Sequence, residues 1–285
     1  MWVSSKWRSD PEFGKRPFWK APPGTVYTLT LKRGNHEYQT TVRLKQILGC
    51  AEQNPAPTFL DELRSKAEKG DPQAQSRLAM VLFAGKFGVA VDKGEAAKWF
   101  RKAAEQNMAA AQYMLGILYA SGDGPAKDEV EAFKWFRKAA EQNQAAAQYK
   151  VGVAYDNGFG VSQDDVKALK WYRKAAEQND APAQTSLGYH YILGKAVTKD
   201  EVEGAKWFRK AAYQNDRDAQ WNLSTCYTHG LGVPKDFVQA CKWGLLAAKR
   251  GDETAKERLP KLLKLMTPEQ LQEAQELAVE FEAVQ

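Results

Sequence analysis

Five tryptophans, each 36 residues after the one before, constrain this chain more than any other feature of its sequence. They are Trp99, Trp135, Trp171, Trp207 and Trp243. Each stands in a recurring block, KWFRKAAEQN at 98–107 and 134–143, KWYRKAAEQN at 170–179, KWFRKAAYQN at 206–215 and, more loosely, KWGLLAAKRG at 242–251. A fixed period of roughly 20 to 50 residues is typical of stacked-repeat proteins, whose units pack only on their neighbours. The period predicts an elongated core instead of a globular one.

Each unit carries the start and stop signals of two antiparallel helices. An Asp stands before the second helix of every unit, where its carboxylate can accept hydrogen bonds from free backbone N–H groups. These N-caps are Asp92, Asp128, Asp164, Asp200 and Asp236, and an acid or amide three residues on predicts a near capping box at Glu95, Glu131, Glu203 and Gln239. The stop position of the second helix holds only Gly or Asn, which tolerate a left-handed backbone, at 70, 107, 143, 179, 215 and 251.

The first helix of each unit carries Leu-Gly-x-x-Tyr or a variant of it, as at 115–119 and 187–191. A small residue beside two large ones leaves room for a neighbouring helix to approach closely. Gly152 should therefore have no space for a side chain. The units predicted from these landmarks cover 71–106, 108–142, 144–178, 180–214 and 216–250.

The chain before the repeats differs in character. Residues 1–57 carry nine Lys/Arg and four Asp/Glu, a net charge of +5, whereas the other 228 residues carry 32 basic and 31 acidic groups. Two β-prone runs around Gly34-Asn35 predict a hairpin at 25–43. We therefore divide the chain into a basic, aromatic-rich extension (1–57), a repeat array (58–266) and a C-terminal capping helix (267–285).

The repeat pattern resembles the Sel1-like repeat family, which is related to the tetratricopeptide repeats. The resemblance covers 58–266 and rests on the pattern A-x-A-Q-x-x-L-G-x-x-Y…G-x-G-V…D…A-x-x-W-x-x-K-A-A-E-Q, here at 109–142. It implies an all-α fold, a right-handed α/α superhelical solenoid of five repeats with half-repeat caps, to which the small N-terminal β-hairpin extension is added. It also implies an adaptor for protein–protein contacts without catalytic activity. Some members are secreted and cysteine-bridged in every repeat; this chain lacks those cysteines.

Several function classes lack support in the sequence. No apolar run is long enough to cross a bilayer, the first ten residues are polar and charged, and the chain has only three cysteines, so we expect a cytoplasmic protein. His36, His190 and His229 lie in no catalytic motif. Cys226, His229 and Cys241 lack a fourth ligand and a CxxC spacing, so no metal and no cofactor is predicted.

Solenoids generally bind partners on their concave side. By analogy with tetratricopeptide repeats, the residues two before and two after the Leu of each first helix should face that side, and four of them form an aromatic row. The predicted partner-binding residues are Ser76, Met80, Tyr113, Ile117, Tyr149, Val153, Thr185, Tyr189, Trp221 and Thr225. The alternative is that these rings pack between neighbouring units.

Two main functions remain open at this point. The first is an adaptor that binds an extended segment or a protruding loop of another protein. The second is an immunity or inhibitor protein that blocks a cognate toxin or enzyme. A further alternative is contact of residues 1–57 with nucleic acid or a membrane surface, suggested by their charge and aromatic content but by no known binding signature.

Overall fold

The computed structural model describes residues 26–33, 36–43 and 58–284 of the chain. This part contains thirteen helices and two strands. Contacts divide the chain into two compact units, Met1–Ser65 and Lys66–Gln285. The division falls inside the first of these helices, α2 (Phe59–Glu68).

The described backbone of the first unit includes two antiparallel strands, β1 (Val26–Arg33) and β2 (His36–Arg43). Their register pairs Val26 with Arg43 and Arg33 with His36. Both strands lie inside the range expected for a hairpin, 25–43. The turn expected at 34–35 and the rest of the basic extension lie outside the described residues.

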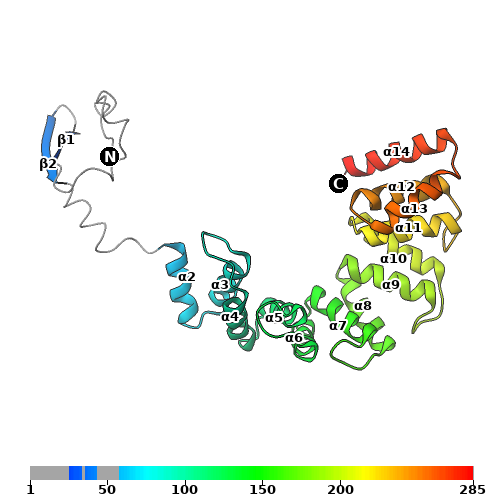
Figure 1. Cartoon of the computed structure of the whole chain (residues 1–285), viewed down its shortest axis with the longest axis horizontal. Coiled ribbons are helices and arrows are strands. Elements are labelled where there is room, and N and C mark those ends of the chain that lie inside the picture. The colour runs from blue at the N-terminus through cyan, green and yellow to red at the C-terminus, as the bar shows by residue number, and fades with distance from the viewer. Residues whose placement is uncertain (1–25, 34–35, 44–57, 285) are drawn as a thin grey trace. The chain divides into compact units, whose positions relative to one another are not determined.

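The compact part Lys66–Gln285 holds five helix pairs, one for each 36-residue repeat unit. Within it, helices that follow one another in the chain pack together (Figure 1). The first helices are α3 (Pro72–Ala84), α5 (Ala109–Ser121), α7 (Ala145–Asn157), α9 (Ala181–Leu193) and α11 (Arg217–His229). The second helices are α4 (Lys93–Glu105), α6 (Glu129–Glu141), α8 (Asp165–Glu177), α10 (Glu201–Tyr213) and α12 (Phe237–Lys249). The predicted α/α solenoid is confirmed.

The predicted N-caps of the second helices are confirmed, but the capping boxes are not. In α4, for example, Asp92 accepts a hydrogen bond from the backbone N–H of Glu95 at 2.8 Å. The Glu95 side chain does not bond back to the cap; it forms an ion pair with Lys98 at 3.2 Å. The KWFRK block supplies that lysine one turn further on, so the carboxylate has a cationic partner. A complete box caps α14 (Pro268–Ala283) at Thr267, and Thr58 and Asp61 exchange the same two bonds at the start of α2.

The helix stops follow the prediction. Asn107, Asn143, Asn179 and Asn215 have φ between 64° and 67°, and the glycines at 70 and 251 also have positive φ. The backbone at this position is left-handed, which ends each second helix and turns the chain into the next unit.

The small residues of the first helices let the second helices approach. A Cβ added at Gly152 would lie 2.6 Å from Cδ1 of Tyr172, and one at Gly188 would lie 2.7 Å from Cδ1 of Phe208. These rings are almost completely buried. In each of these units, a ring of the second helix (Tyr172 or Phe208) therefore packs directly on the glycine of the first helix.

A ladder of alternately buried and exposed glutamines, whose role sequence reasoning missed, joins successive units. Gln142 Nε2 donates to Gln112 Oε1 at 2.7 Å and to Asn107 Oδ1 at 3.1 Å. Gln112 Nε2 in turn donates to the Ala104 carbonyl at 3.0 Å. The same contacts recur along the array, so the buried amide of each first helix at Gln112, Gln148 and Gln184 is bonded by the exposed glutamine that ends the second helix of its unit. Arg250 stands where the last glutamine would be and donates to Asn215 Oδ1.

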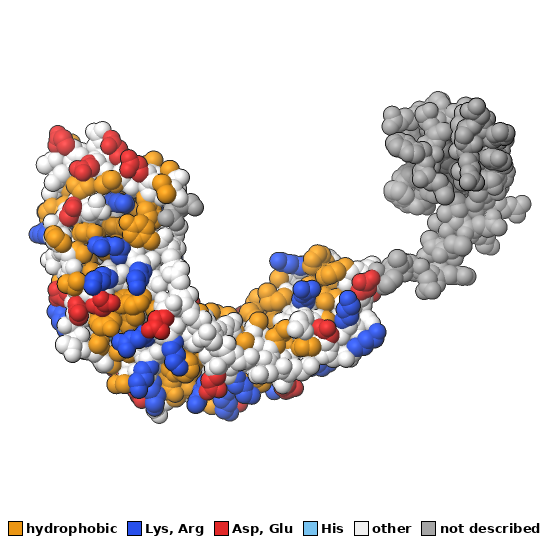
Figure 2. Space-filling model, turned by 180° about the vertical axis from the view of Figure 1, so that it is seen from behind, with side chains coloured by type: hydrophobic (Ala, Val, Ile, Leu, Met, Phe, Trp, Pro, Cys, Tyr) orange, Lys and Arg blue, Asp and Glu red, His pale blue; other side chains and the backbone are white. Residues whose placement is uncertain are grey.

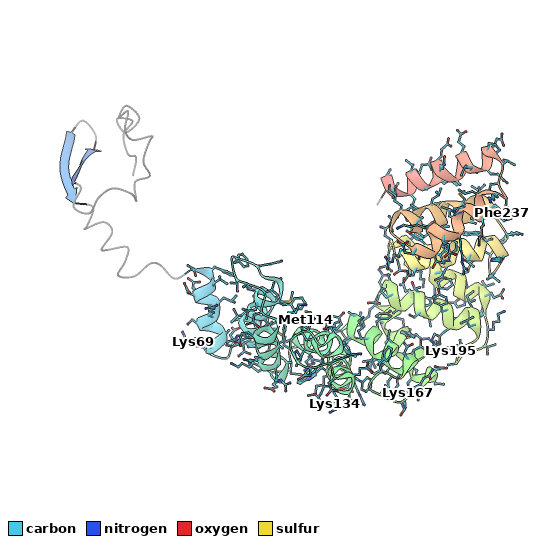
Figure 3. The ribbon with its side chains drawn as sticks, in the orientation of Figure 1. Lys69, Met114, Lys134, Lys167, Lys195 and Phe237 are labelled. Atoms are coloured by element: carbon cyan, nitrogen blue, oxygen red, sulfur yellow. The ribbon has the colours of Figure 1, made fainter. Side chains whose placement is uncertain are left out.

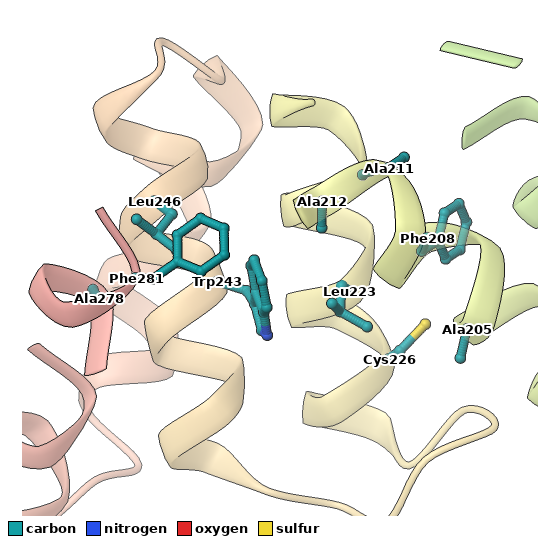
Figure 4. Close-up of a cluster of buried hydrophobic side chains, with 11 residues drawn as sticks. Ala205, Phe208, Ala211, Ala212, Leu223, Cys226, Trp243, Leu246, Ala278 and Phe281 are labelled. Atoms are coloured by element: carbon teal, nitrogen blue, oxygen red, sulfur yellow. The ribbon is translucent and has the colours of Figure 1, made fainter. Parts of the chain in front are cut away.

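The C-terminal end is closed by α13 (Glu253–Leu263) and α14. Figure 4 shows Phe281 of α14 against Trp243 of α12, with ring centroids 5.1 Å apart. Leu246 and Ala278 belong to the same buried cluster. The last helix therefore covers apolar surface of the fifth unit, as a terminal cap must in a repeat array.

Candidate partner-binding surface

The ten residues predicted to contact a partner all lie on the first helices. Met80 and Tyr189 are the most open, each with 44% of its surface exposed. Seven others are half-buried: Ser76, Tyr113, Ile117, Tyr149, Val153, Trp221 and Thr225.

Thr185 departs from the prediction because only 6% of its surface is exposed. Its hydroxyl donates to the Ala181 carbonyl at 3.1 Å and lies 3.0 Å from Oδ1 of Asp216. Asp216 caps α11 of the next unit. Thr185 therefore joins two units, and its side chain is not free to contact a partner.

Three of the residues Tyr113, Tyr149, Tyr189 and Trp221, here called the aromatic row, are supported by a ring of the second helix that follows. Tyr113 contacts Phe136, Tyr149 contacts Tyr172 and Tyr189 contacts Phe208, with ring centroids 5.8, 5.9 and 5.2 Å apart. The row is thus partly a packing feature, and these three ring contacts lie within single units. One side of each of these rings is occupied, and the residual exposure is what a partner could reach.

Trp221 continues the row by a different contact. The second helix that follows has Gly244 at the position of the supporting ring, and a Cβ there would lie 3.8 Å from Cζ3 of Trp221. A larger side chain on α11 thus accompanies a smaller one on α12. This exchange of volume explains why a tryptophan outside the 36-residue period occurs at 221.

Carboxylates collect near the aromatic row at the starts of α9, α11 and α13, where Asp180, Asp216 and Asp252 are N-caps. Burial, reinforced by the charge of Asp180, raises the pKa of the Tyr113 and Tyr149 hydroxyls. Burial also raises the pKa of the Asp180 and Asp218 carboxyls, and Asp216 adds to both shifts. The 36-residue spacing of Asp180, Asp216 and Asp252 was visible in the sequence, but it was not connected with this surface.

A cavity of about 360 Å³ opens between the second and third units. Its walls are mainly apolar and include Phe133, Phe136 and Phe159, together with Ile117 and Val153 from the predicted binding residues. Lys127, Glu129 and Lys150 also line it. Figure 2 shows hydrophobic side chains interleaved with charged ones on one face of the array.

The corresponding place between the third and fourth units is filled by polar groups. His190, 2% exposed, lies 3.5 Å from Asp156 Oδ1 through its Nε2. Lys195, labelled in Figure 3, forms ion pairs with Asp156 at 2.6 Å and Asp165 at 3.1 Å. The hydrogen bond to Asp156 is the main cause of the raised pKa of the Lys195 ammonium. The carboxylates and the ammonium are engaged with each other, which describes a structural network.

The cysteines and histidines considered as catalytic or metal-binding groups form no such site in the described part of the chain. Burial raises the pKa of the Cys226 thiol to about 12 and that of Cys241 to about 11, so neither thiol is activated as a nucleophile. Within residues 58–284, no group of three or more His, Cys, Asp or Glu side chains is arranged to hold a metal ion. No helix of the described chain is both long and apolar enough to cross a membrane.

Several solved structures share this fold. The chain is similar to a Sel1 repeat protein from Oxalobacter formigenes, with 34% identity and a TM-score of 0.67 over 81% of this chain and 96% of the other. It is also similar to a protective antigen of uropathogenic Escherichia coli that displays an SLR fold, with 32% identity and a TM-score of 0.68 over 84% of this chain. The match spans 56% of that antigen's length.

An immunity protein from Pseudomonas aeruginosa matches with 21% identity and a TM-score of 0.48 over 81% of this chain and 85% of the other, a similarity too low to carry an argument about function. No curated protein sequence matches the chain. The Sel1 repeat family model matches residues 72–108, 109–144, 145–180, 181–216 and 217–252, which agree with the predicted units to within two residues. The chain therefore belongs to the Sel1 repeat family.

Proposed function

We propose that this chain is a non-catalytic scaffold that binds an extended segment or a protruding loop of a partner protein along the aromatic row. The observation that carries the proposal is a partly exposed aromatic side chain with a polar tip on the first helix of each of four successive units. Such side chains are frequent anchors at protein interfaces, because they combine a large apolar area with a hydrogen-bonding group. The packing beneath them holds them in place before a partner arrives.

The charge around the row favours a partner with basic groups at the C-terminal end of the array. Asp216 and Asp218 lie on or next to α11, and the pKa of Asp218 is raised mainly by burial. A lysine or arginine placed beside these carboxylates would compensate charges that the fold brings close together. The effect should be visible as a salt dependence of partner binding.

Site-specific photo-crosslinking tests the proposal. A photoreactive phenylalanine analogue replaces Met80 or Tyr189 on the first helices, and a matched control carries it at Lys170, an exposed position of α8. In cells of the source organism, Met80 and Tyr189 should crosslink to a partner and Lys170 should not. Crosslinking at Lys170 alone would place the binding surface on the second helices and overturn the proposal.

The stoichiometry of the crosslinked complex separates the two functions that the sequence leaves open. Several partners, each bound reversibly, favour an adaptor. One partner bound tightly in a one-to-one complex, with loss of that partner's activity, favours an immunity or inhibitor protein.

A further inference from the structure

Two fixed repeat positions correspond to each other on successive first helices, and at one such pair, Asp156 and His190, the side chains approach to 3.5 Å. One position stands in the last turn of the earlier helix and the other at the beginning of the last turn of the later helix. In chain order the pairs are Phe83 and Leu118, Ala120 and Ala154, Asp156 and His190, and Ile192 and Cys226. The second pair is the smallest, because both members are alanine.

The structure shows what this choice of residues does. Ile192 and Cys226 belong to one apolar cluster, and Asp156 and His190 approach to 3.5 Å, so these two pairs fill their own space. Ala120 and Ala154 instead line the cavity of about 360 Å³. The cavity therefore follows from the two small residues that the sequence places at one contact of the array.

The walls of this cavity suit an aromatic or large aliphatic side chain. Phe133, Phe136 and Ala154 are each at most 8% exposed and form its buried part. Phe159, which is 50% exposed, stands at its edge in the α7–α8 turn. A volume of this size falls within the range of roughly 300–1,000 Å³ found for ligand sites in proteins.

The polar groups of the cavity carry a net positive charge. Lys127 forms an ion pair with Glu129 at 2.9 Å. Lys150 has no carboxylate within 4.0 Å among the described residues; its ammonium lies 5.5 Å from the centroid of the Tyr149 ring, and Asp180 is close enough for a weaker electrostatic interaction. Lys150 can therefore accept a further carboxylate. In the preceding unit the same position is Met114, which is labelled in Figure 3.

We propose that this cavity receives a large apolar side chain, aromatic in the best case, from a partner segment that carries a carboxylate next to it for Lys150. The cavity continues the predicted binding surface, because Ile117 and Val153 belong to both. The occupant is accordingly a polypeptide segment, and the inference rests on the proposed function. The inference specifies the chemistry of one contact residue on the partner, a large apolar side chain next to a carboxylate.

Short peptides serve as probes on the full-length chain with isotope-labelled methyl groups. The probe is acetyl-Gly-Phe-Glu-Gly-amide, and the two control peptides replace its Phe by Ala or its Glu by Lys. We expect the Phe-Glu peptide to shift the methyl signals of Ile117 and Val153 with an affinity on the order of millimolar. The Ala peptide should bind weaker by about ten-fold or more, and the Lys peptide weaker by several-fold.

The repeat itself supplies the variants. Ala154→Leu introduces the residue found at this position in Leu118, so it should fill the cavity, abolish the shift at Ile117 and leave the melting temperature unchanged or raised. Ala120→Phe, which copies Phe83, fills the cavity from the other side if the first variant does not fold. Lys150→Met, which copies Met114, should keep Phe-dependent binding and remove the preference for Glu over Lys.

Equal binding of the Phe and Ala peptides, or unchanged binding to a folded Ala154→Leu variant, would overturn the inference. So would octanoate binding tighter than the Phe-Glu peptide, since that result indicates a small amphiphile as the occupant. The proposed function is tested separately. A crosslinked partner that binds Ala154→Leu with unchanged affinity refutes the anchor and leaves the scaffold standing, whereas crosslinking at Lys170 alone refutes the scaffold.

Discussion

The replacement Gly160→Ala tests how the turn of one unit rests on the unit before it. Gly160 has φ +66°, and a Cβ there would lie 2.0 Å from the carbonyl oxygen of Glu129, at the start of α6. A carbon and a carbonyl oxygen that are not bonded stay about 3.3 Å apart or more, so the turn and the helix would have to separate by more than about 1 Å. Gly232 repeats this geometry against Glu201, where the distance is 1.9 Å.

Gly158 is a matched control in the same turn. Its φ is +76°, but a Cβ would meet no atom closer than 3.6 Å. An alanine at either position must therefore adopt a left-handed backbone, which lowers the free energy of unfolding by about 1–2 kcal/mol. Only the alanine at 160 must also push two packed segments apart, which adds about 1–3 kcal/mol.

Urea-induced unfolding of the full-length variants, followed by circular dichroism, measures this difference. Gly158→Ala should lower the free energy of unfolding by about 1–2 kcal/mol, and Gly160→Ala by about 2–5 kcal/mol in all. The pair Gly230→Ala and Gly232→Ala should show the same order, because Gly230 also has no neighbour closer than 3.7 Å. Equal losses within each pair would refute the argument that the turn glycines are required by contact between units.

Three further predictions concern the buried amides, a helix cap and the aromatic row. Gln148→Leu should cost about 1–3 kcal/mol in urea unfolding, because it leaves buried amide and carbonyl groups without partners, whereas the exposed control Gln163→Leu should change stability by less than about 0.5 kcal/mol. Burial raises the pKa of Asp180, so Asp180→Asn, which keeps a capping side chain, should be more stable than the wild type at pH 7. That advantage should disappear as the pH falls through the raised pKa toward the ordinary value of 3.8, since the wild-type carboxyl is then neutral too; urea midpoints at pH 7 and pH 4 check it. The double variant Tyr149→Phe, Trp221→Phe should bind the crosslinked partner more weakly in titration calorimetry, and its thermal unfolding shows whether the rings still pack. Unchanged affinity would show that the Tyr149 hydroxyl and the Trp221 N–H do not contact the partner.

The sequence by itself determined the number of units and the beginning and end of each second helix. These are local properties of the backbone. An aspartate can cap a helix and an asparagine can hold a left-handed φ without help from distant residues, and both recur every 36 positions. The small residue at 152 was also predictable, because only a close helix contact requires glycine inside a helix.

The tertiary structure alone decided which side chains of the first helices remain open. Thr185 and Tyr149 occupy the same repeat position as Tyr113, yet Thr185 is buried, with its hydroxyl 3.0 Å from Asp216 of the next unit. The cavity beside Ala154 likewise depends on two alanines 34 residues apart that meet only when the units stack. Helix limits follow from neighbours in the chain, whereas open surface follows from neighbours in space, and for this reason the fold could be predicted and the binding surface only in part.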